Sequence, residues 1–241
     1  MLMTLPVFDL VAATPRSRLV RLDLKRQTFS YRAGQAVFLG MHGQELQRPY
    51  SIASAPEEAE QRGWLELLIQ LGEGGAPAPH LQGLKRGALL DVAGPYGTFV
   101  LPDNPSERHF LFIAGGSGIA PLRAMLWHLL LAPPASSSDG NRLHIGVLYS
   151  ARTPDEFAYA DELERLVAER RIRLRRTVTR GSRVGWSGHL GRIGADHLSA
   201  LLIDPETLCF VCGPRSLVEE MPALLHNLGI APDRIRLEER R

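Results

Sequence analysis

Hydrophobic and polar positions in the N-terminal part of the chain form short segments. Six segments rich in Val, Ile, Leu and Phe are separated by Pro, Gly or charged turns, and they cover residues 7–13, 19–24, 36–41, 51–54, 64–71 and 89–94. Turn signals about every 8 to 15 residues are typical of antiparallel β structure. The pattern predicts an antiparallel β-barrel or sandwich from Val7 to Leu101.

A different pattern begins after Pro102-Asp103-Asn104-Pro105, where strand-like and helix-like segments alternate. Residues 109–114 form a continuous apolar run, as expected for a strand buried on both faces, and the next helix is expected over about 119–131 with Pro121 in its first turn. Further strands are expected at 143–149, 172–178, 207–212 and 235–238. The helices between them are expected to include one with Phe157, Leu163, Leu166 and Val167 at helical spacing, a short one after Gly194, and one that ends near Asn227.

Alternating strands and helices are typical of a parallel sheet. We therefore expect two domains. Residues 1–103 are predicted to form the antiparallel β-barrel, and residues 104–241 an α/β domain with a parallel sheet.

Composition removes several classes of protein. The chain has 241 residues, of which 44% are hydrophobic and 22% charged, so it is an ordinary globular sequence rather than a disordered or fibrous one. Its two cysteines are too few for a disulfide-rich scaffold or for a plant-type iron–sulfur cluster. A net charge of +2 does not indicate a nucleic-acid binder.

The sequence shows neither a membrane-spanning segment nor a signal peptide. The longest apolar stretch, residues 124–132, is far shorter than the roughly 20 residues of a membrane helix. The N-terminus lacks a basic segment and carries Asp9 where the core of a signal peptide would lie. We expect a cytoplasmic protein that does not span a membrane.

A glycine-rich turn joins the first strand and helix of the predicted α/β domain, in the sequence Ile113-Ala-Gly-Gly-Ser-Gly-Ile-Ala-Pro121. Unpaired N–H groups and the helix dipole make such a turn attractive to phosphate. It is neither the dinucleotide fingerprint, because Pro121 stands where the third glycine would be, nor a P-loop, because no Gly-Lys-Ser/Thr follows. Taken alone, a tight turn without a ligand is the lesser alternative, because glycine often only marks a turn.

Two other segments carry candidate chemistry. In Arg48-Pro-Tyr-Ser51, a guanidinium suited to phosphate adjoins a ring suited to stacking and a hydroxyl suited to a ring nitrogen; the alternative is a strand with an exposed Arg and a packed Tyr. Cys209 and Cys212 share a predicted strand, which sends them to opposite faces about 10 Å apart at ~3.3 Å per residue. They are therefore expected to form neither a disulfide nor a metal site.

Four motifs together resemble the ferredoxin–NADP reductase superfamily. They are Arg48-Pro-Tyr-Ser51, Gly94-Pro-Tyr-Gly-Thr-Phe99, Gly115-Gly-Ser-Gly-Ile-Ala-Pro121 and Cys212-Gly-Pro214, in the family's order and over nearly the whole chain. The resemblance implies a flavin-binding barrel, then a nicotinamide-nucleotide domain, with the two rings stacked at the cleft between them. It implies an NAD(P)H-dependent flavoprotein reductase, with NADPH or NADH as co-substrate.

On the flavin side, the resemblance implies that Arg48 holds the flavin phosphate, with Pro49 beside it, that Tyr50 stacks on the isoalloxazine and that Ser51 bonds near N5. Gly74, Gly75 and Ala76 resemble the backbone turn that meets the rest of the phosphate. The family's usual Ser or Thr two residues later is Ala78 here, so one phosphate hydrogen bond is lacking. FAD is the expected flavin, and FMN is the alternative.

On the nucleotide side, the resemblance implies that Gly115, Gly116, Ser117, Gly118 and Pro121 cradle the pyrophosphate. Cys212, Gly213 and Pro214 would border the nicotinamide. Glu238 would serve the same site, in a C-terminal segment that lacks the family's terminal aromatic residue. Arg152 and Arg180 resemble the site of the adenosine ribose, where two guanidiniums suit a 2′-phosphate and favour NADPH slightly over NADH.

The expected reaction needs placement more than acid–base chemistry, because the cofactor carries the hydride transfer. Ser51, Cys212 and Glu238 are the predicted catalytic residues, no metal is expected, and the eight histidines are interpreted as surface or packed residues without a fixed Ser or Asp partner.

The expected acceptor of the electrons is a separate protein, a ferredoxin or an oxygenase component. Docking of such an acidic partner is one interpretation of an arginine-rich stretch, and a solvated face is the other; its members are Arg165, Arg170, Arg171, Arg173, Arg175, Arg176, Arg180 and Arg183. Two further hypotheses stay open: a reductase of free flavin, and a non-catalytic subunit that senses nucleotide or docks partners.

Overall fold

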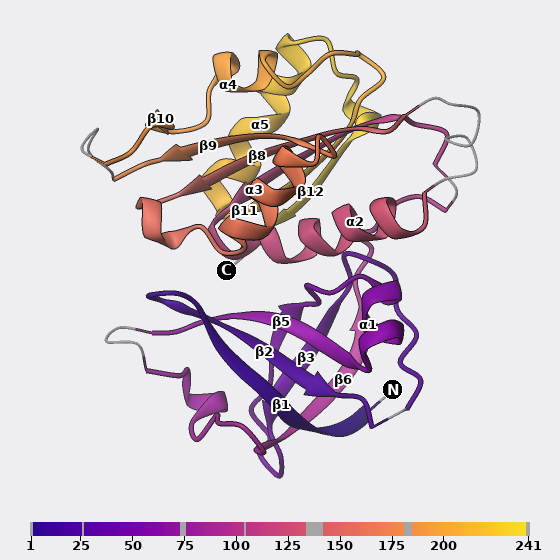
Figure 1. Cartoon of the computed structure of the whole chain (residues 1–241), viewed down its shortest axis with the longest axis vertical. Helices are drawn as coiled ribbons and strands as arrows, with labels where there is room; N and C mark the ends of the chain where they lie inside the picture. The colour runs from indigo at the N-terminus through magenta and orange to yellow at the C-terminus, as the bar shows by residue number, and fades with distance from the viewer. Residues whose placement is uncertain are drawn as a thin grey trace. The chain divides into compact units, whose positions relative to one another are not determined.

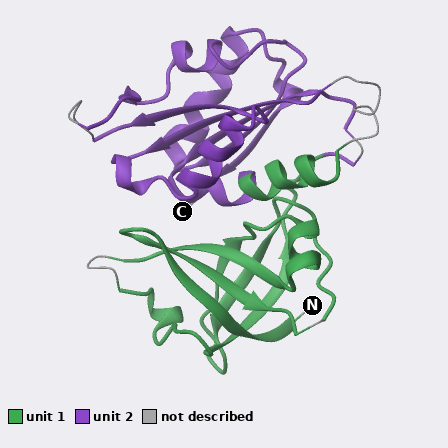
Figure 2. Cartoon of the chain, in the orientation of Figure 1, with its two compact units in different colours: residues 1–101, 123–133 green, residues 102–122, 134–241 purple. Residues whose placement is uncertain are grey.

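The computed structural model describes residues 2–25, 27–72, 76–103, 105–133, 142–180 and 185–239. The chain divides into two compact units (Figure 2). Unit 1 comprises Met1–Leu101 and Arg123–Pro133, and unit 2 comprises Pro102–Leu122 and Pro134–Arg241. Helix α2 (Ile119–Leu131) is therefore divided, with its first turn in unit 2 and the rest in unit 1.

Unit 1 is an antiparallel barrel (Figure 1). Its strands are β1 (Leu2–Thr14), β2 (Ser17–Asp23), β3 (Ala36–Met41), β4 (Arg48–Ser51), β5 (Trp64–Gln70) and β6 (Leu89–Tyr96). They pair in the order β4-β3-β6-β1-β2-β5. An antiparallel bridge between Ile52 and Leu67 joins the two ends of this order and closes the sheet.

Alternation along the strands decides which side chains form the barrel core. In β3, Val37 and Leu39 are fully buried, whereas Phe38 between them is exposed. Leu5 and Val7 of β1 point inward in the same way. This is the period of two expected for strands that bury one face.

Two features of unit 1 differ from the pattern-based prediction. The fourth strand is Arg48–Ser51, so it begins three residues earlier than the apolar run 51–54 indicated. A short helix, α1 (Pro56–Arg62), was not predicted, because it buries only Glu58 and Ala59 and so shows no apolar period. Its ends are fixed locally: the Glu58 carboxylate accepts from the Ala55 N–H at 2.9 Å, and Gly63 ends the helix at φ 75°.

Unit 2 is a parallel sheet flanked by helices (Figure 1). Its strands, β7 (His109–Gly115), β8 (His144–Ala151), β9 (Arg173–Val178), β10 (His189–Leu190), β11 (Leu208–Gly213) and β12 (Ile235–Glu239), pair in the order β10-β9-β8-β7-β11-β12. The further helices are α3 (Ala160–Ala168), α4 (Ala195–Ser199) and α5 (Arg215–Asn227). The predicted antiparallel barrel followed by a parallel α/β domain is confirmed.

Alternating residues of the central strands face opposite layers. Leu111 and Cys209 pack in one buried cluster with α4 and α5, to which α5 contributes Met221 and Leu225. Phe112 and Phe210 meet on the other face, with ring centroids 5.8 Å apart. The central strands thus bury both faces, as continuous apolar runs predict.

The helix predicted around Phe157 begins later than expected. Phe157 precedes α3 and follows the 3₁₀ turn Pro154–Glu156, and only Leu163 and Leu166 of the helix itself are buried. Phe157 is apolar because it packs against another aromatic residue: its ring meets the Tyr149 ring edge-on, with the ring centroids 4.9 Å apart. Among the described residues, no helix is long and apolar enough to cross a membrane.

Candidate functional site

The carboxyl ends of the parallel strands bring together most of the residues predicted to bind nucleotide. Ala114 pairs with Cys212, Cys212 pairs with Glu238, and Gly115 pairs with Ser150. Parallel register places these ends at the same edge of the sheet, where open α/β sheets bind ligands. Ala114 and Cys212, which are far apart in the sequence, are thereby direct neighbours in unit 2.

The glycine turn after β7 is tight for steric reasons. A Cβ on Gly118 would lie 2.1 Å from the Cys212 carbonyl oxygen, and one on Gly115 would lie 2.7 Å from Cδ of Pro214. Gly116 adopts φ 55°, in the left-handed region that favours glycine. The turn therefore closes directly onto the end of β11, and Gly116 and Ser117 stay partly exposed at the start of α2.

The buried side chain of Tyr149 holds this turn in place by a hydrogen bond. Tyr149 is fully buried, its hydroxyl donates to the Gly116 carbonyl at 3.0 Å, and it accepts from the Ala158 N–H at 3.3 Å. Burial raises the pKa of Tyr149 above its usual range, so the hydroxyl keeps its proton and can donate. Sequence reasoning missed Tyr149; the available signal was a tyrosine at the end of an otherwise apolar strand, which needs a polar partner.

Cys212 and Glu238 form a polar pair at the same edge. The Cys212 thiol is directed at the Glu238 carboxylate, with Sγ 3.6 Å from Oε2. Cys212 is fully buried and Glu238 is partly exposed. The exposed ring of Pro214 follows them in the chain, so the structure brings together the thiol, carboxylate and proline that were predicted to border the nicotinamide.

Arg152 and Arg180 leave the sheet at neighbouring points. The Arg180 N–H donates to the Arg152 carbonyl at 2.8 Å, and both side chains are exposed. The two arginines are therefore neighbours along the backbone just beyond β8 and β9. Two guanidiniums there would suit a dianionic phosphate.

The strand β4 presents the flavin motif of unit 1. Arg48 and Pro49 are exposed, Tyr50 is half-buried against the barrel core, and Ser51 is 1% exposed. Burial therefore increases along the four residues of the motif, from the exposed guanidinium of Arg48 to the buried hydroxyl of Ser51. This order of a guanidinium, a ring face and a hydroxyl matches the phosphate, ring and ring nitrogen of a flavin.

Part of the predicted phosphate turn cannot be placed. Gly74 and Gly75 lie outside the described residues, whereas Ala76 is exposed and its carbonyl accepts from the Gly72 N–H at 2.8 Å. Ala78 begins the 3₁₀ turn Pro79–Leu81, with its carbonyl accepting from the Leu81 N–H. Its methyl side chain offers no hydrogen bond.

The interpretation that no histidine has a fixed Ser or Asp partner was wrong for His42 and His109. The Nδ1 atom of His42 lies 2.8 Å from Asp91, that of His128 2.8 Å from Glu57, and that of His109 3.2 Å from Asp204. His80, 4% exposed, bonds to the Tyr50 hydroxyl. These partners are 30 or more residues away in sequence, so local spacing could not reveal them.

The pairing with His42 affects the pKa of Asp91. Burial raises its pKa, but hydrogen bonds from Thr4, His42 and the Gly43 N–H outweigh that effect, and the net shift of the pKa is downward. No group of three or more His, Cys, Asp or Glu in the described part of the chain could hold a metal ion.

Several arginines of the basic stretch are used within unit 2. Arg173 donates to the carbonyl of Leu201, and Arg175 bonds to His189. Arg176 pairs with Glu164 and lies 5.3 Å from the ring centroids of both Phe157 and Trp186. These contacts favour the interpretation as a structural face; Arg183 lies outside the described residues.

Comparison with known families agrees with this division of roles. Residues 8–101 match the "Oxidoreductase FAD-binding domain" and residues 112–222 the "Oxidoreductase NAD-binding domain". A β-barrel with the flavin motif followed by a parallel sheet with the nucleotide turn defines a flavin- and nicotinamide-dependent oxidoreductase.

Individual relatives define the family of this chain more narrowly. Ferredoxin–NADP reductase B of Sorangium cellulosum is 35% identical over 244 residues, covering 95% of each chain. The chain belongs to the ferredoxin–NADP reductase superfamily and is an NAD(P)H-dependent, FAD-containing reductase. The crystal structure of a ferredoxin–NADP⁺ reductase from Neisseria gonorrhoeae with bound FAD and NADP shares the fold, at a TM-score of 0.78 and 22% identity over 99% of this chain and 98% of that one. The Amycolatopsis cytochrome P450 reductase structure gives a TM-score of 0.82 at 22% identity, over 99% of this chain and 70% of that one.

Proposed function

We propose that this reductase passes electrons from NAD(P)H through its FAD to a separate protein acceptor, a ferredoxin or an oxygenase component. The observation that carries the proposal is that both the flavin motif and the nucleotide motif are present, in domains that match FAD-binding and NAD-binding families. The names of its relatives, a ferredoxin–NADP reductase and a P450 reductase, support a protein acceptor.

In unit 1, Arg48 would hold the flavin phosphate, with Pro49 ordering the strand beside it. The half-buried ring of Tyr50 would support the isoalloxazine, and Ser51 would offer its hydroxyl near N5. Bound flavin supplies the hydride-accepting ring and the change from two-electron to one-electron transfer. The protein contributes orientation and a limited approach for water. Ala76, with Gly74 and Gly75, would meet the remaining phosphate through the backbone.

In unit 2, Gly115, Gly116, Ser117 and Gly118 would hold the pyrophosphate against the start of α2, with Pro121 fixing the first turn of that helix. Cys212, Gly213 and Pro214 would border the nicotinamide, and Glu238 would hold the Cys212 proton in place. Arg152 and Arg180 would read a 2′-phosphate. We take residues 1–103 and 104–241 as the two functional domains, which the matched ranges 8–101 and 112–222 support.

Anaerobic rapid mixing tests the proposal. The purified chain carrying FAD is mixed with NADPH or NADH while the flavin absorbance is followed, and the reduced chain is then titrated with ferredoxins, free FMN and free FAD. We expect the flavin to bleach with a nicotinamide nucleotide and to be reoxidised faster by a ferredoxin than by an equal concentration of free flavin. A chain that binds nucleotide without bleaching would instead be a sensor or docking subunit.

A reductase of free flavin is the second candidate, and Ala78 is the observation that favours it. The missing hydroxyl removes one phosphate hydrogen bond and so weakens retention of the flavin. If FAD is lost on gel filtration and the steady-state rate saturates with added FMN or FAD, the second candidate is correct and the protein acceptor is not needed.

A further inference from the structure

Tyr50 and His80 approach one place in unit 1 from two separate segments of the chain. Tyr50 belongs to β4 and His80 to the 3₁₀ turn Pro79–Leu81. The Tyr50 hydroxyl lies 2.8 Å from Nε2 of His80, and the two ring centroids are 5.8 Å apart. This contact joins the strand that carries the flavin motif to the segment that follows the predicted phosphate turn.

His80 is held firmly in this place. It is 4% exposed, and its neighbour Leu81 is fully buried in the barrel core. The Leu81 N–H donates to the Ala78 carbonyl at 2.8 Å, and the Gln82 N–H donates to the Pro79 carbonyl at 3.2 Å. The backbone that carries the imidazole is therefore fixed by both packing and hydrogen bonds, and the His80 ring itself is buried.

The direction of the hydrogen bond follows from the charge state of His80. Burial lowers the pKa of His80, and the positive charge of Arg48 lowers it further. A neutral imidazole has one nitrogen that accepts, and a tyrosine hydroxyl is a good donor near pH 7. The Tyr50 hydroxyl is therefore the donor when the imidazole proton is on Nδ1, which leaves Nε2 free to accept.

We propose that His80 is a positioning residue of the flavin site: by its hydrogen bond to the Tyr50 hydroxyl, it fixes the plane of the Tyr50 ring and couples that ring to the turn that follows Ala78. The inference rests on the proposed contact between Tyr50 and the flavin. A side chain that is fixed before the ligand arrives loses less conformational entropy on binding, so this hydrogen bond strengthens flavin retention. It acts at the turn where Ala78 offers no hydroxyl.

A double-mutant cycle on FAD affinity tests the inference. The flavin-stripped full-length chain and its variants His80→Phe, Tyr50→Phe and His80→Phe/Tyr50→Phe are titrated with FAD, and the quenching of FAD fluorescence gives Kd. We expect each single variant to weaken binding about three- to tenfold, as one hydrogen bond does. The double variant should be no weaker than the weaker single one, because both changes remove the same bond.

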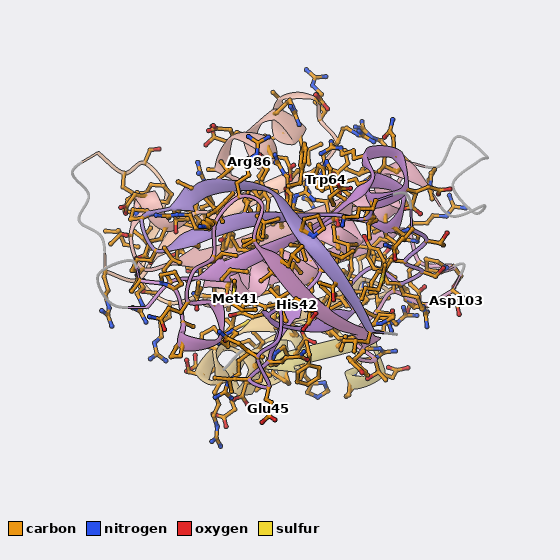
Figure 3. All side chains as sticks on the ribbon, turned by 90° about the horizontal axis from the view of Figure 1, so that it is seen from below. Met41, His42, Glu45, Trp64, Arg86 and Asp103 are labelled. Atoms are coloured by element: carbon orange, nitrogen blue, oxygen red, sulfur yellow. The ribbon has the colours of Figure 1, made fainter. Side chains whose placement is uncertain are left out.

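Two further variants separate positioning from packing. His80→Gln places an acceptor where Nε2 lies, so its Kd should return to within about twofold of wild type and the residual fluorescence of bound FAD should match it. His42→Phe is the control, since His42 also hydrogen-bonds a side chain in unit 1, at Asp91, but in the loop after β3 that Figure 3 labels. It should leave the FAD Kd unchanged.

The outcomes distinguish failure of the inference from failure of the flavin site. If Arg48→Ala and Tyr50→Ala weaken FAD binding but His80→Phe does not, or if the two Phe substitutions act independently, then His80 has no positioning role. If Arg48→Ala and Tyr50→Ala bind FAD like wild type, then the flavin does not lie on β4. Should His80→Phe fail to fold, His80→Leu takes its place in the cycle: a double variant no weaker than the weaker single one would support the inference, and additive losses would overturn it.

Discussion

The two cysteines of β11 have different environments although they are three residues apart. Cys209 packs against α4 and α5, and burial raises its pKa to about 12. Cys212 faces the carboxyl edge of the sheet, with its thiol directed at Glu238. The first environment keeps a thiol inert, whereas the second places one beside the predicted nicotinamide site.

Replacing Cys212 with Ala is expected to slow reduction of the flavin by NADPH roughly ten- to a hundredfold, because a misplaced nicotinamide loses much of the benefit of orientation. The flavin content should stay the same. Anaerobic stopped-flow absorbance measures the rate. Cys209→Ala is the matched control, since it removes a thiol from the same strand but from the opposite face; it should alter stability and not the rate. Equal rates in wild type and Cys212→Ala would leave Cys212 as a packing residue.

Arg152 and Arg180, whose backbones are hydrogen-bonded to each other, lead to a prediction about the choice of nucleotide. Changing either one to Gln should reduce the preference for NADPH over NADH about tenfold, the effect expected for loss of a charge-assisted hydrogen bond to phosphate. The ratio of kcat/KM for the two nucleotides measures it. Arg165→Gln, on α3 and near Glu169, is the control. If the ratio does not move in either variant, the 2′-phosphate is not read here.

At the level of elements, the site depends on how closely the turn after β7 approaches the end of β11. Gly118 tolerates this approach only because it has no side chain. The close contact links a strand, a turn and a helix in one geometry. Chemistry that is distributed over several strand ends therefore requires accurate strand register.

The substitution Gly118→Ala tests that dependence. Its Cβ would meet backbone atoms of Cys212 and Gly213 at 2.1 to 2.9 Å, so the turn and β11 must separate. We expect a loss of about 1–3 kcal/mol in the free energy of unfolding, together with much weaker NADP⁺ binding, measured by denaturation and by titration calorimetry. Gly194→Ala serves as the control, since its Cβ would make only an ordinary contact, 3.9 Å from Nδ1 of His197. Wild-type affinity in Gly118→Ala would contradict the assigned role of the turn.

At the scale of the whole molecule, helix α2 starts at the nucleotide turn and continues into unit 1. Within unit 1, Arg123 is 3% exposed, and its guanidinium donates two hydrogen bonds to the Glu58 carboxylate, at 2.9 and 3.1 Å. It also donates to the Ala53 carbonyl at 2.8 Å. A buried guanidinium thus ties the helix to α1 and to the segment after β4.

Breaking this pair should destabilise the protein strongly. Arg123→Met leaves the Glu58 carboxylate buried without its main partner, which typically costs about 3–5 kcal/mol. Urea denaturation measures the loss. The exposed pair of Arg215 and Glu219 offers the comparison, since Arg215→Met should cost less than about 1 kcal/mol. Similar losses for the two variants would mean that burial does not govern the contribution of Arg123.

The pH dependence of stability follows from three histidines. Burial lowers the pKa values of His80, His144 and His197 from 6.5, with added effects of Arg48 on His80, of His109 on His144 and of His189 on His197. The unfolded chain therefore binds protons first as the pH falls, and stability that is present above about pH 6.5 is lost below it. We expect Tm to fall between pH 7 and pH 5. A flat or rising Tm over this interval would show that these histidines are not neutral in the folded state.

The sequence by itself determined the fold class and the order of the motifs. Apolar periods predicted the strands of both units apart from β10 (His189–Leu190), whose two residues are exposed, because burial of one or both faces determines which residues of a strand are apolar. The motifs around Tyr50, Gly116 and Cys212 fixed the candidate site, because glycine and reactive side chains at strand ends are local features.

Only the tertiary structure decided which side chains meet. The bond of Tyr50 to His80 and the grip of Arg123 on Glu58 join residues 30 and 65 positions apart, so no local period records them. The helix α1 escaped prediction because its ends are set by capping rather than by an apolar face. A sequence pattern reports whether a residue is buried, whereas its partner depends on strand order and register, which arise when distant segments pack.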